Sequence, residues 1–353
     1  MTLVNFMPID RRRPVALELL RSDLPSAAAR VSAEDVQLII PSSAQDVVAA
    51  LPSEKVFCAD DSFGYVYAND TAAARVLVGE KPLPSAVSGT TGAEAVVSGE
   101  AWLRGGEKKV VYVGDKRVEM PSNTTTRELL AAAGVAEDGL KAVYLGYPMC
   151  TFVSPEHLGD AVTLSCDEAR VLGQGDCAVE AVRSILEAFR HESCGRCVFG
   201  NEGGHQLFAI FTDACNGKGQ SSDVALMRDL VPVMREQALC EVGQRMAFVV
   251  EQALDLFGDE IESHVSRHQC PAGQCRALVT FHILVSRCIG CGKCMDVCED
   301  DAIEGKAGFV HVVKQKDCTH CGKCLDACPK GAVVTAGVKK PKTPPHPIPC
   351  RVH

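Results

Sequence analysis

The sequence predicts a multidomain α+β protein, and three observations favour this class. The chain has 353 residues, 46% of them hydrophobic, which suffices for two or three domains on the usual scale of about 150 residues each. Alternating strand and helix patterns fill its first half, and longer amphipathic helix patterns follow. A repeated cysteine pattern lies near the end. We therefore expect a small N-terminal α/β unit, a mixed module, a helical bundle and a cysteine-rich C-terminal domain.

Residues 1–98 are expected to form the small α/β unit. Apolar periods of two and of about 3.6 residues alternate along this segment. They predict, in order, helix 14–22, strand 35–40, helix 43–51, strand 55–59 and helix 69–79. The residues of this unit indicate no function.

Charge and apolar runs exclude several classes of partner. The formal net charge is −9, from 36 Lys and Arg against 45 Asp and Glu. Nucleic acids and anionic membranes need clustered basic residues, so neither is an expected partner. The chain start lacks a signal-peptide pattern, and no apolar run reaches the roughly 18 residues of a membrane span. We expect a cytoplasmic protein, in which metal ligation accounts for the abundance of cysteines, 19 in all, better than disulfides do.

The cysteine repeat carries the strongest signal. The segments CIGCGKCMDVC and CTHCGKCLDAC start thirty residues apart and share the spacing C-x2-C-x2-C-x3-C. This spacing is typical of bacterial ferredoxins with two [4Fe–4S] clusters, in which the fourth cysteine of each half binds the other half's cluster. One cluster is thus assigned to Cys288, Cys291, Cys294 and Cys328, and the other to Cys318, Cys321, Cys324 and Cys298. A pair of zinc knuckles is the alternative, but zinc sites do not need four cysteines per half.

Three amphipathic helix patterns precede the repeat: AVEAVRSILEAFRHE, SSDVALMRDLVPVMRE and GQRMAFVVEQALDLFGDEI. The apolar face of the first comprises Val179, Val182, Leu186 and Phe189. Cys194 and Cys197 follow its C-terminal end, and Cys240 falls in the turn between the other two. A helical bundle that holds a cluster in its loops accounts for this arrangement.

These segments resemble a known family. They are similar to the C-terminal half of the flavin-containing NADH-oxidising subunit of respiratory complex I, electron-bifurcating [FeFe]-hydrogenases and related formate dehydrogenases. The segments that carry the similarity are VEAVRSILEAFRHESCGRC, LCEVG at 239–243, CPAGQC at 270–275 and the ferredoxin repeat. The preceding segment, with a hairpin, a helix starting near Thr125 and a following strand, looks like the family's β-grasp (SLBB) module. The resemblance covers residues 99–353.

The resemblance implies a domain order for this part of the chain. The expected segments are a β-grasp module at 99–170, an iron–sulfur helical bundle at 171–262, a Cys/His hinge at 263–280, a two-cluster ferredoxin domain at 281–337 and a proline-rich tail at 338–353. We expect the tail, KKPKTPPHPIPCRVH, to be an extended arm that is disordered or docks on a partner.

The bundle site departs from the family pattern. The family has C-x2-C-x2-C followed by a distant fourth cysteine; Cys194, Cys197 and Cys240 match three of these positions, and Gly200 occupies the other. Because glycine cannot ligate iron, the site would use a neighbouring ligand, hold a smaller cluster such as [3Fe–4S], or stay empty. The candidate replacement ligands are Asn201, Glu202, His205 and Cys215.

A Cys/His segment follows the bundle. Cys270 and Cys275 enclose a Pro-Gly turn, and a zinc site with His264 as third ligand is one reading. The resemblance implies such a zinc site; the alternative is that both thiols only pack in the core. The cysteines without partners at ligand spacing are expected to be core residues: Cys58, Cys150, Cys166, Cys177 and Cys215.

The family's glycine-rich loop for flavin and NADH phosphates is missing from the sequence, as is any G-x-G-x-x-G motif. No FMN or NAD is therefore expected, and no catalytic residues are recognised. We predict an electron-transfer subunit of a cytoplasmic redox complex, with a flavoprotein, a hydrogenase or formate dehydrogenase, a thioredoxin-like [2Fe–2S] protein or soluble ferredoxin as partners. The rival predictions are a diaphorase with an unrecognised flavin site and a docking scaffold whose upstream clusters are lost.

Overall fold

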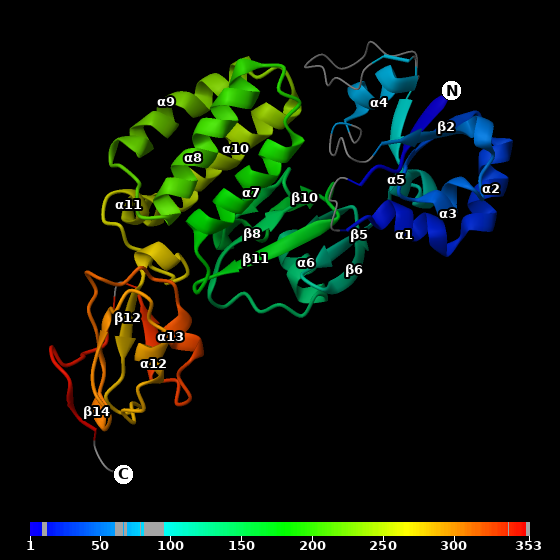
Figure 1. Cartoon of the computed structure of the whole chain (residues 1–353). Helices are drawn as coiled ribbons and strands as arrows, with labels where there is room; N and C mark the ends of the chain where they lie inside the picture. Colours follow the sequence, from blue (N-terminus) through cyan, green and yellow to red (C-terminus); the bar gives the residue numbers. More distant parts are fainter. Residues whose placement is uncertain are drawn as a thin grey trace. The chain divides into compact units, whose positions relative to one another are not determined.

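The structure is a computed structural model, and it describes residues 1–8, 13–60, 66, 69–77, 79–80, 95–337 and 339–350. The chain divides into two compact units (Figure 1). The first comprises Met1–Gln174, Val182–Phe208 and Leu226–Leu256; the second comprises Gly175–Ala181, Ala209–Ala225 and Phe257–His353. Each unit is described by itself.

The first unit begins with a four-stranded parallel sheet in the order β3-β2-β1-β4. Its strands are β1 (Thr2–Asn5), β2 (Val36–Pro41), β3 (Val56–Ala59) and β4 (Ala95–Ser98). The accompanying helices are α1 (Val15–Ser22), α2 (Leu24–Ala33), α3 (Gln45–Val48), the 3-10 helix η1 (Ser53–Lys55), α4 (Asp70–Leu77) and α5 (Gly99–Arg104). The α/β character expected for this segment is confirmed.

Both faces of this sheet are covered. Leu38 and Ile40 of β2 point into one apolar core together with Phe6, whereas Ile39 points into a second core with Leu3. Alternate side chains of a strand lie on opposite faces, so a strand apolar at consecutive positions is expected where both faces are buried. Cys58 is exposed on the edge strand β3, and the expectation that it lies in the core is wrong.

A second sheet of five strands follows in the order β6-β5-β11-β8-β9. Its strands are β5 (Lys108–Val113), β6 (Lys116–Pro121), β8 (Leu140–Leu145), β9 (Thr151–Val153) and β11 (Glu168–Gly173). A two-stranded sheet of β7 (Asn123–Thr125) and β10 (Ala161–Thr163), helix α6 (Thr126–Ala132) and the 3-10 helix η3 (Pro155–His157) complete it.

Helix α6 begins where the sequence predicts. The Thr125 side chain accepts a hydrogen bond from the backbone N–H of Glu128, and the Glu128 carboxylate accepts one from the backbone N–H of Thr125. This capping box satisfies two amides at the helix start. Cys150 and Cys166 are buried in this part of the chain, as expected of packing residues.

The helical region contains α7 (Ala178–Glu192), the π-helix η4 (Phe199–Gly203), α8 (Gly204–Cys215), α9 (Ser222–Gln237), α10 (Glu241–Leu256) and α11 (Gly258–Val265). The predicted apolar face of α7 is buried, with Val179, Val182, Leu186 and Phe189 at most 1% exposed. Close packing near η4 depends on small residues. A Cβ at Gly203 would lie 2.8 Å from Met234 Sδ, and one at Gly204 would lie 2.6 Å from Met246 Sδ.

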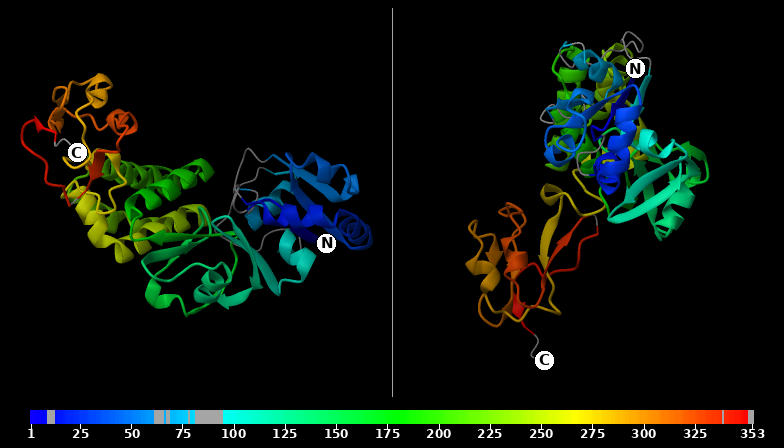
Figure 2. Two further views of the ribbon diagram at one scale, coloured as in Figure 1. Left: turned by 90° about the horizontal axis from the view of Figure 1, so that it is seen from below. Right: turned by 90° about the vertical axis from the view of Figure 1, so that its right-hand side faces the viewer.

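The end of the second unit consists of short, paired elements. They are the 3-10 helix η5 (Arg276–Leu278), α12 (Lys293–Asp296), α13 (Lys323–Asp326), and the strand pairs β12 (Thr280–Ile283) with β16 (Val333–Ala336), β13 (Ile303–Glu304) with β15 (Val312–Val313), and β14 (Phe309–Val310) with β17 (Ile348–Pro349). Figure 2 shows this part in orange and red from two further directions.

Among the residues described, no helix is both long and apolar enough to cross a bilayer.

Candidate iron–sulfur and metal sites

The two halves of the cysteine repeat build two separate cavities. One is lined by Cys288, Cys291, Cys294 and Cys328, and the other by Cys298, Cys318, Cys321 and Cys324. The fourth cysteine of each half thus lies in the cavity of the other half. This is the crossed distribution of thiols that the spacing suggests.

Local backbone geometry brings the cysteines of each half together. Cys294 and Cys324 lie in the first turns of α12 and α13, each preceded by a glycine with positive φ, Gly292 at 80° and Gly322 at 83°. Glycine adopts this left-handed conformation without the strain that a side chain would add. The chain therefore turns sharply between the second and third cysteine of each half.

The thiols of these cavities need a cationic centre to ionise together. Burial and the neighbouring thiols Cys288 and Cys291 raise the pKa of Cys294 to about 12, and burial raises the pKa of Cys324 to about 11. Cys328 differs because, although burial opposes its ionisation, hydrogen bonds from backbone amides such as that of Ala332 lower its pKa. Bound iron stabilises thiolates, so this donor set fits a [4Fe–4S] cluster in each cavity.

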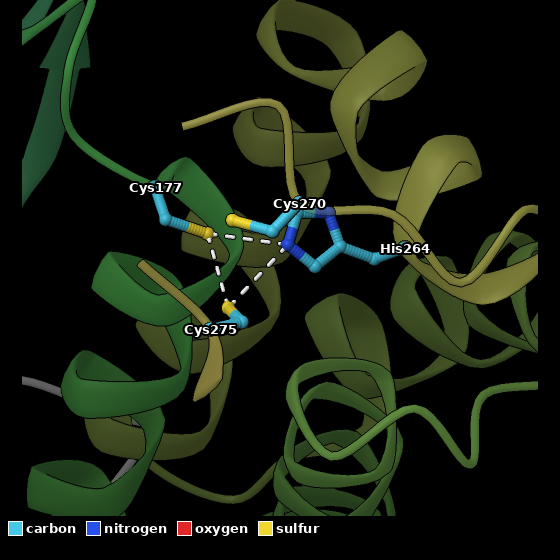
Figure 3. A group of neighbouring side chains, drawn as sticks. All are labelled: Cys177, His264, Cys270 and Cys275. Atoms are coloured by element: carbon cyan, nitrogen blue, oxygen red, sulfur yellow. Dashed lines mark hydrogen bonds between the residues drawn. The ribbon is translucent and has the colours of Figure 1, made fainter. Parts of the chain in front are cut away.

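A different group of donors lies in the second unit around His264. Among the residues described, the donors of Cys177, His264, Cys270 and Cys275 all lie within 4.8 Å of one another (Figure 3). Cys177 Sγ is 3.3 Å from His264 Nε2 and 3.5 Å from Cys275 Sγ, and Cys275 Sγ is 3.5 Å from His264 Nε2. Donors around a tetrahedral zinc ion at about 2.0–2.3 Å are about 3.3–3.8 Å apart. The spacing fits one zinc ion.

Hydrogen bonds with neighbouring residues orient this group. His264 Nδ1 lies 2.8 Å from the carbonyl oxygen of Glu260, so an Nδ1–H donor leaves the Nε2 lone pair directed at the thiols. The carboxylate of Glu260 accepts a hydrogen bond from the backbone N–H of Ala178, next to Cys177. Gln274 accepts another from the backbone N–H of Cys177. Glu260, one turn before His264, and Gln274, next to Cys275, thus fix the backbone around Cys177.

Thiol–thiol contacts also shift the acidity within the group. Hydrogen bonds from the thiols of Cys177 and Cys275 lower the pKa of Cys270. The matching contacts, together with burial, raise the pKa of Cys177. One thiol of this group therefore ionises readily, whereas a second resists ionisation. A bound cation would stabilise the further thiolates.

Cys177 was missed by the sequence interpretation, which treated it as a packing residue. It is buried, but the fold supplies partners far away in the chain. Its position directly before an amphipathic helix was the available signal. Cys215, a candidate replacement ligand for the bundle site, contacts Cys275.

The third group of cysteines lies in the first unit. Cys194, Cys197 and Cys240 line one pocket, together with Glu192, Ser193, Gly195, Arg196, Gly200, Val242 and Gly243. The backbone N–H of Gly200 donates to Cys197 Sγ at 3.3 Å. Asn201, Glu202 and His205 are exposed and do not line this pocket. Glu192, whose carboxylate could serve as a non-thiol ligand, does line the pocket and is only 9% exposed.

Gly200 packs against a second glycine. A Cβ at Gly243, in the first turn of α10, would lie 3.1 Å from the Cα of Gly200. A Cβ at Gly200 itself would lie 2.8 Å from Cys197 Sγ and 3.9 Å from the Cα of Gly243. The loop and the helix start therefore approach closely, and three thiols remain around the pocket. This donor set fits a cluster with three thiolate ligands.

Two known protein-family models match the two cysteine-rich regions of the chain. Residues 180–264 match the model of the NADH-ubiquinone oxidoreductase-F iron-sulfur binding region, and residues 282–335 match that of the 4Fe-4S dicluster domain. The fold and the cysteines thus define an iron–sulfur protein with a 4Fe-4S ferredoxin domain.

The curated relatives belong to oxidoreductase complexes. The chain is 29% identical over 234 residues to NADP-reducing hydrogenase subunit HndC of Solidesulfovibrio fructosivorans, covering 60% of this chain and 48% of the relative. It is 29% identical over 196 residues to a subunit of the NADH-quinone oxidoreductase of Streptomyces coelicolor, covering 49% and 44%. The chain is homologous to these two proteins and spans about half their length.

A solved structure shows a related fold. A chain of the NAD+-reducing [NiFe]-hydrogenase in the H2-reduced state aligns with a TM-score of 0.59 at 20% identity, covering 76% of this chain and 57% of that chain.

A further relative is NADP(+)-dependent formate dehydrogenase subunit beta of Moorella thermoacetica, 28% identical over 121 residues, covering 32% and 17%.

Proposed function

We propose that the chain is an electron-transfer subunit of a multisubunit oxidoreductase, such as a hydrogenase or formate dehydrogenase. The observation that carries the proposal is the pair of four-cysteine cavities in one domain, with Cys298 and Cys328 exchanged between the halves. When bound, [4Fe–4S] clusters supply one-electron carriers. The residues of the chain hold them in fixed positions and surround them with a core of apolar side chains.

The bundle pocket is proposed to hold a third cluster. Cys194, Cys197 and Cys240 supply three thiolates, and Gly200 removes the fourth. A [3Fe–4S] cluster satisfies three thiolates, whereas a four-iron cluster would take an oxygen donor at its remaining iron. Glu192 is the carboxylate in the pocket lining, which makes it our choice over Asn201, Glu202 and His205.

Cys177, His264, Cys270 and Cys275 are proposed to bind a structural zinc ion. Four protein donors leave no open position for a substrate, as in structural zinc sites. All four side chains are at most 6% exposed. The ion would join the chain before α7 to the segment after α11.

The remaining modules are proposed to serve assembly. We propose that residues 99–170 are a β-grasp (SLBB) module; the hairpin of β5 and β6, helix α6 and the parallel pairing of β5 with the central strand β11 support this. We propose that they and the α/β unit at 1–98 dock on partner subunits, including a flavoprotein and a thioredoxin-like [2Fe–2S] protein. Soluble ferredoxin is a further candidate partner, and the cytoplasm the proposed location.

Anaerobic metal, sulfide and flavin analysis of the full chain tests the function. About eight iron atoms per chain are expected for the ferredoxin pair and about eleven or twelve with the bundle cluster, with one zinc. We expect neither FMN nor NADH to remain bound, because the phosphate-binding glycine loop is missing from the sequence. Stoichiometric FMN would favour the diaphorase, and about eight irons without a bundle cluster would favour the scaffold whose upstream clusters are lost.

A further inference from the structure

A buried imidazole lies at the first cavity of the ferredoxin domain, the one lined by Cys288, Cys291, Cys294 and Cys328. His311 is 1% exposed and belongs to the lining of this cavity. Its Nδ1 lies 3.8 Å from Cys288 Sγ, within hydrogen-bond reach of a sulfur atom. A polar side chain therefore contacts one of the four thiols that are expected to ligate iron.

The surroundings of the His311 ring indicate which nitrogen carries the hydrogen. A neutral imidazole has one N–H and one nitrogen with a free lone pair. His311 Nε2 has no hydrogen-bond partner among the residues described, and a buried N–H without a partner is costly. A hydrogen on Nδ1 instead has Cys288 Sγ as its acceptor once this sulfur is a thiolate. The Nδ1–H tautomer therefore fits a loaded cavity.

The backbone on both sides of His311 is held by strand pairs. The preceding strand β14 pairs antiparallel with β17, and the following strand β15 pairs antiparallel with β13. The backbone N–H of Cys350 also donates to the carbonyl oxygen of Gly308 at 2.9 Å. The end of the chain thus folds back on the ferredoxin domain, and the expectation of a disordered or partner-bound tail is wrong for residues 348–350.

Glycines make room for the ring and fix the cysteine loop against its strand. A Cβ at Gly305 would lie 2.2 Å from His311 Cδ2, so a larger residue at 305 would displace the imidazole. The backbone N–H of Gly308 donates to the carbonyl oxygen of Gly290 at 3.1 Å, which joins the segment before His311 to the loop that follows Cys288. The approach of the ring to the sulfur is therefore a property of the packed backbone.

The second half of the repeat carries a different side chain at this position. The second cavity is the one lined by Cys298, Cys318, Cys321 and Cys324. Phe281 precedes His311 by thirty residues, the period of the repeat, and it lines the second cavity as His311 lines the first. Phe281 is 2% exposed, and a phenyl ring has no N–H to donate. The two cavities therefore differ by one donor at equivalent places.

Charged residues differ between the cavities in the same direction. Arg287 and Lys330 line the first cavity, whereas Asp300 lines the second. The potential of an iron–sulfur cluster depends on nearby charge and on hydrogen bonds to its sulfurs. Cations and N–H donors stabilise the reduced cluster, which carries one more negative charge, and a carboxylate destabilises it. Both differences favour reduction at the first cavity.

We propose that His311 donates its Nδ1–H to the Cys288 thiolate and makes the cluster of the first cavity the one that is reduced first. The inference rests on the proposed function, because it requires a cluster in each cavity. A hydrogen bond to sulfur strengthens as the negative charge on the sulfur grows, so it stabilises the reduced state more than the oxidised state. The second cavity then holds the stronger reductant of the pair.

The test is a redox titration of the full chain, reconstituted without oxygen, as the wild type, His311→Phe and His311→Asn. His311→Phe copies the residue of the second cavity and removes the donor, whereas His311→Asn keeps an N–H near the place of Nδ1. The phenylalanine variant should make reduction at the first cavity about tenfold less favourable relative to the second, about 59 mV for one electron. The asparagine variant should shift it less. An unchanged potential in His311→Phe at full iron content would overturn the proposal.

Phe281→Leu is the matched control. It replaces the aromatic ring at the equivalent place of the second cavity without changing any N–H donor, so the potential of the first cluster should stay the same. A shift of that potential as large as in His311→Phe would mean that packing of the domain, not the hydrogen bond, sets it. The iron content of the wild-type chain, about eight atoms for two clusters, tests the cluster assignment itself, separately from the hydrogen bond.

A measurement on the half-reduced wild-type chain covers the case in which a variant fails to fold. With histidine labelled by nitrogen-15 in the imidazole ring only, pulsed paramagnetic resonance should detect nitrogen coupling to the cluster that is reduced first. The coupling should be lost in His311→Phe. The absence of this coupling from the wild type, or its persistence in His311→Phe, would contradict the proposal.

Discussion

Cys177 Sγ lies 3.3 Å from His264 Nε2 although 87 residues separate them in the chain. The contact closes a loop between the start of α7 and the end of α11, and Glu260 supports both sides through its carboxylate and its carbonyl oxygen. A metal ion at this point would contribute its binding free energy to folding of the second unit, because the unfolded chain does not hold these donors together.

Cys177→Ala should abolish stoichiometric zinc binding. Three donors would remain, and one would be needed from water, which weakens a structural site. Zinc measured by mass spectrometry on the purified chain should fall from one per chain to near zero. Cys166→Ala is the control, since this thiol is also buried but lies in the core of the first unit. Zinc retained in Cys177→Ala would remove this residue from the ligand set.

Cys298→Ser and Cys328→Ser should each damage the cluster nucleated by the other half of the repeat. Cys298 lines the cavity of Cys318, Cys321 and Cys324, and Cys328 lines that of Cys288. Each variant should lose up to about four irons, with a different resonance signal missing in each case. If Cys298→Ser instead altered the signal that Cys294→Ser removes, the ligands would not cross.

Gly200→Cys should convert the bundle pocket to four thiolates. The backbone at this position is not left-handed, and the nearest obstacle to a Cβ is the movable side chain of Cys197. We expect about one additional iron per chain if the native cluster is [3Fe–4S], and a shifted reduction potential if it already has four irons.

Gly200→Ala is the matched control for this change. It adds the same Cβ beside Cys197 without a ligand, and so separates crowding from ligation. Glu192→Gln should alter the native signal if this carboxylate binds the fourth iron. Identical iron counts and spectra in the wild type, Gly200→Cys and Gly200→Ala, with only the ferredoxin signals, would show that the pocket holds no cluster.

Lys109→Met should destabilise the first unit more at pH 8 than at pH 5. The Lys109 ammonium contacts the buried carboxylates of Glu100 and Asp167, and burial raises the pKa of Asp167 even with this partner present. Without the ammonium, the cost of the ionised Asp167 carboxylate applies above its raised pKa and fades as Asp167 protonates at lower pH. We expect a loss of about 3–5 kcal/mol at pH 8.

Amide hydrogen exchange of β5 and β11 in the full chain would measure that local free energy. Lys108→Met serves as the control, because Lys108 is 63% exposed and pairs only at the surface with Glu119. A deficit independent of pH would mean that lost packing, not the unpaired carboxylates, limits stability.

Local patterns made much of the fold predictable. The capping box at Thr125 and the apolar face of α7 follow from neighbouring residues. Helix α2 was not predicted; its Pro25 lies in the first turn, where proline is tolerated. Strand β1, only four residues long at the start of the chain, is recognisable chiefly through its parallel pairing with β2, which is non-local.

The site residues also divide into those that local sequence predicts and those that only the fold reveals. The ferredoxin cysteines lie at short, fixed spacings, so their grouping was predictable from the chain alone. Cys177 reaches its group through a tertiary contact with His264, and no spacing rule encodes such a partner. Glu192 was not predicted either, although its position two residues before Cys194, at the end of α7, was a local signal for the pocket.

A stepwise reductive titration of the anaerobic full chain, followed by paramagnetic resonance, tests the electron-transfer assignment most directly. The account predicts two reversible signals from the ferredoxin pair, together about two unpaired spins per fully reduced chain, that interact because both clusters lie in one small domain. The bundle cluster would add a signal sensitive to Gly200→Cys. A chain that takes up no electrons at iron, or does so only when FMN is bound to it, would contradict the account.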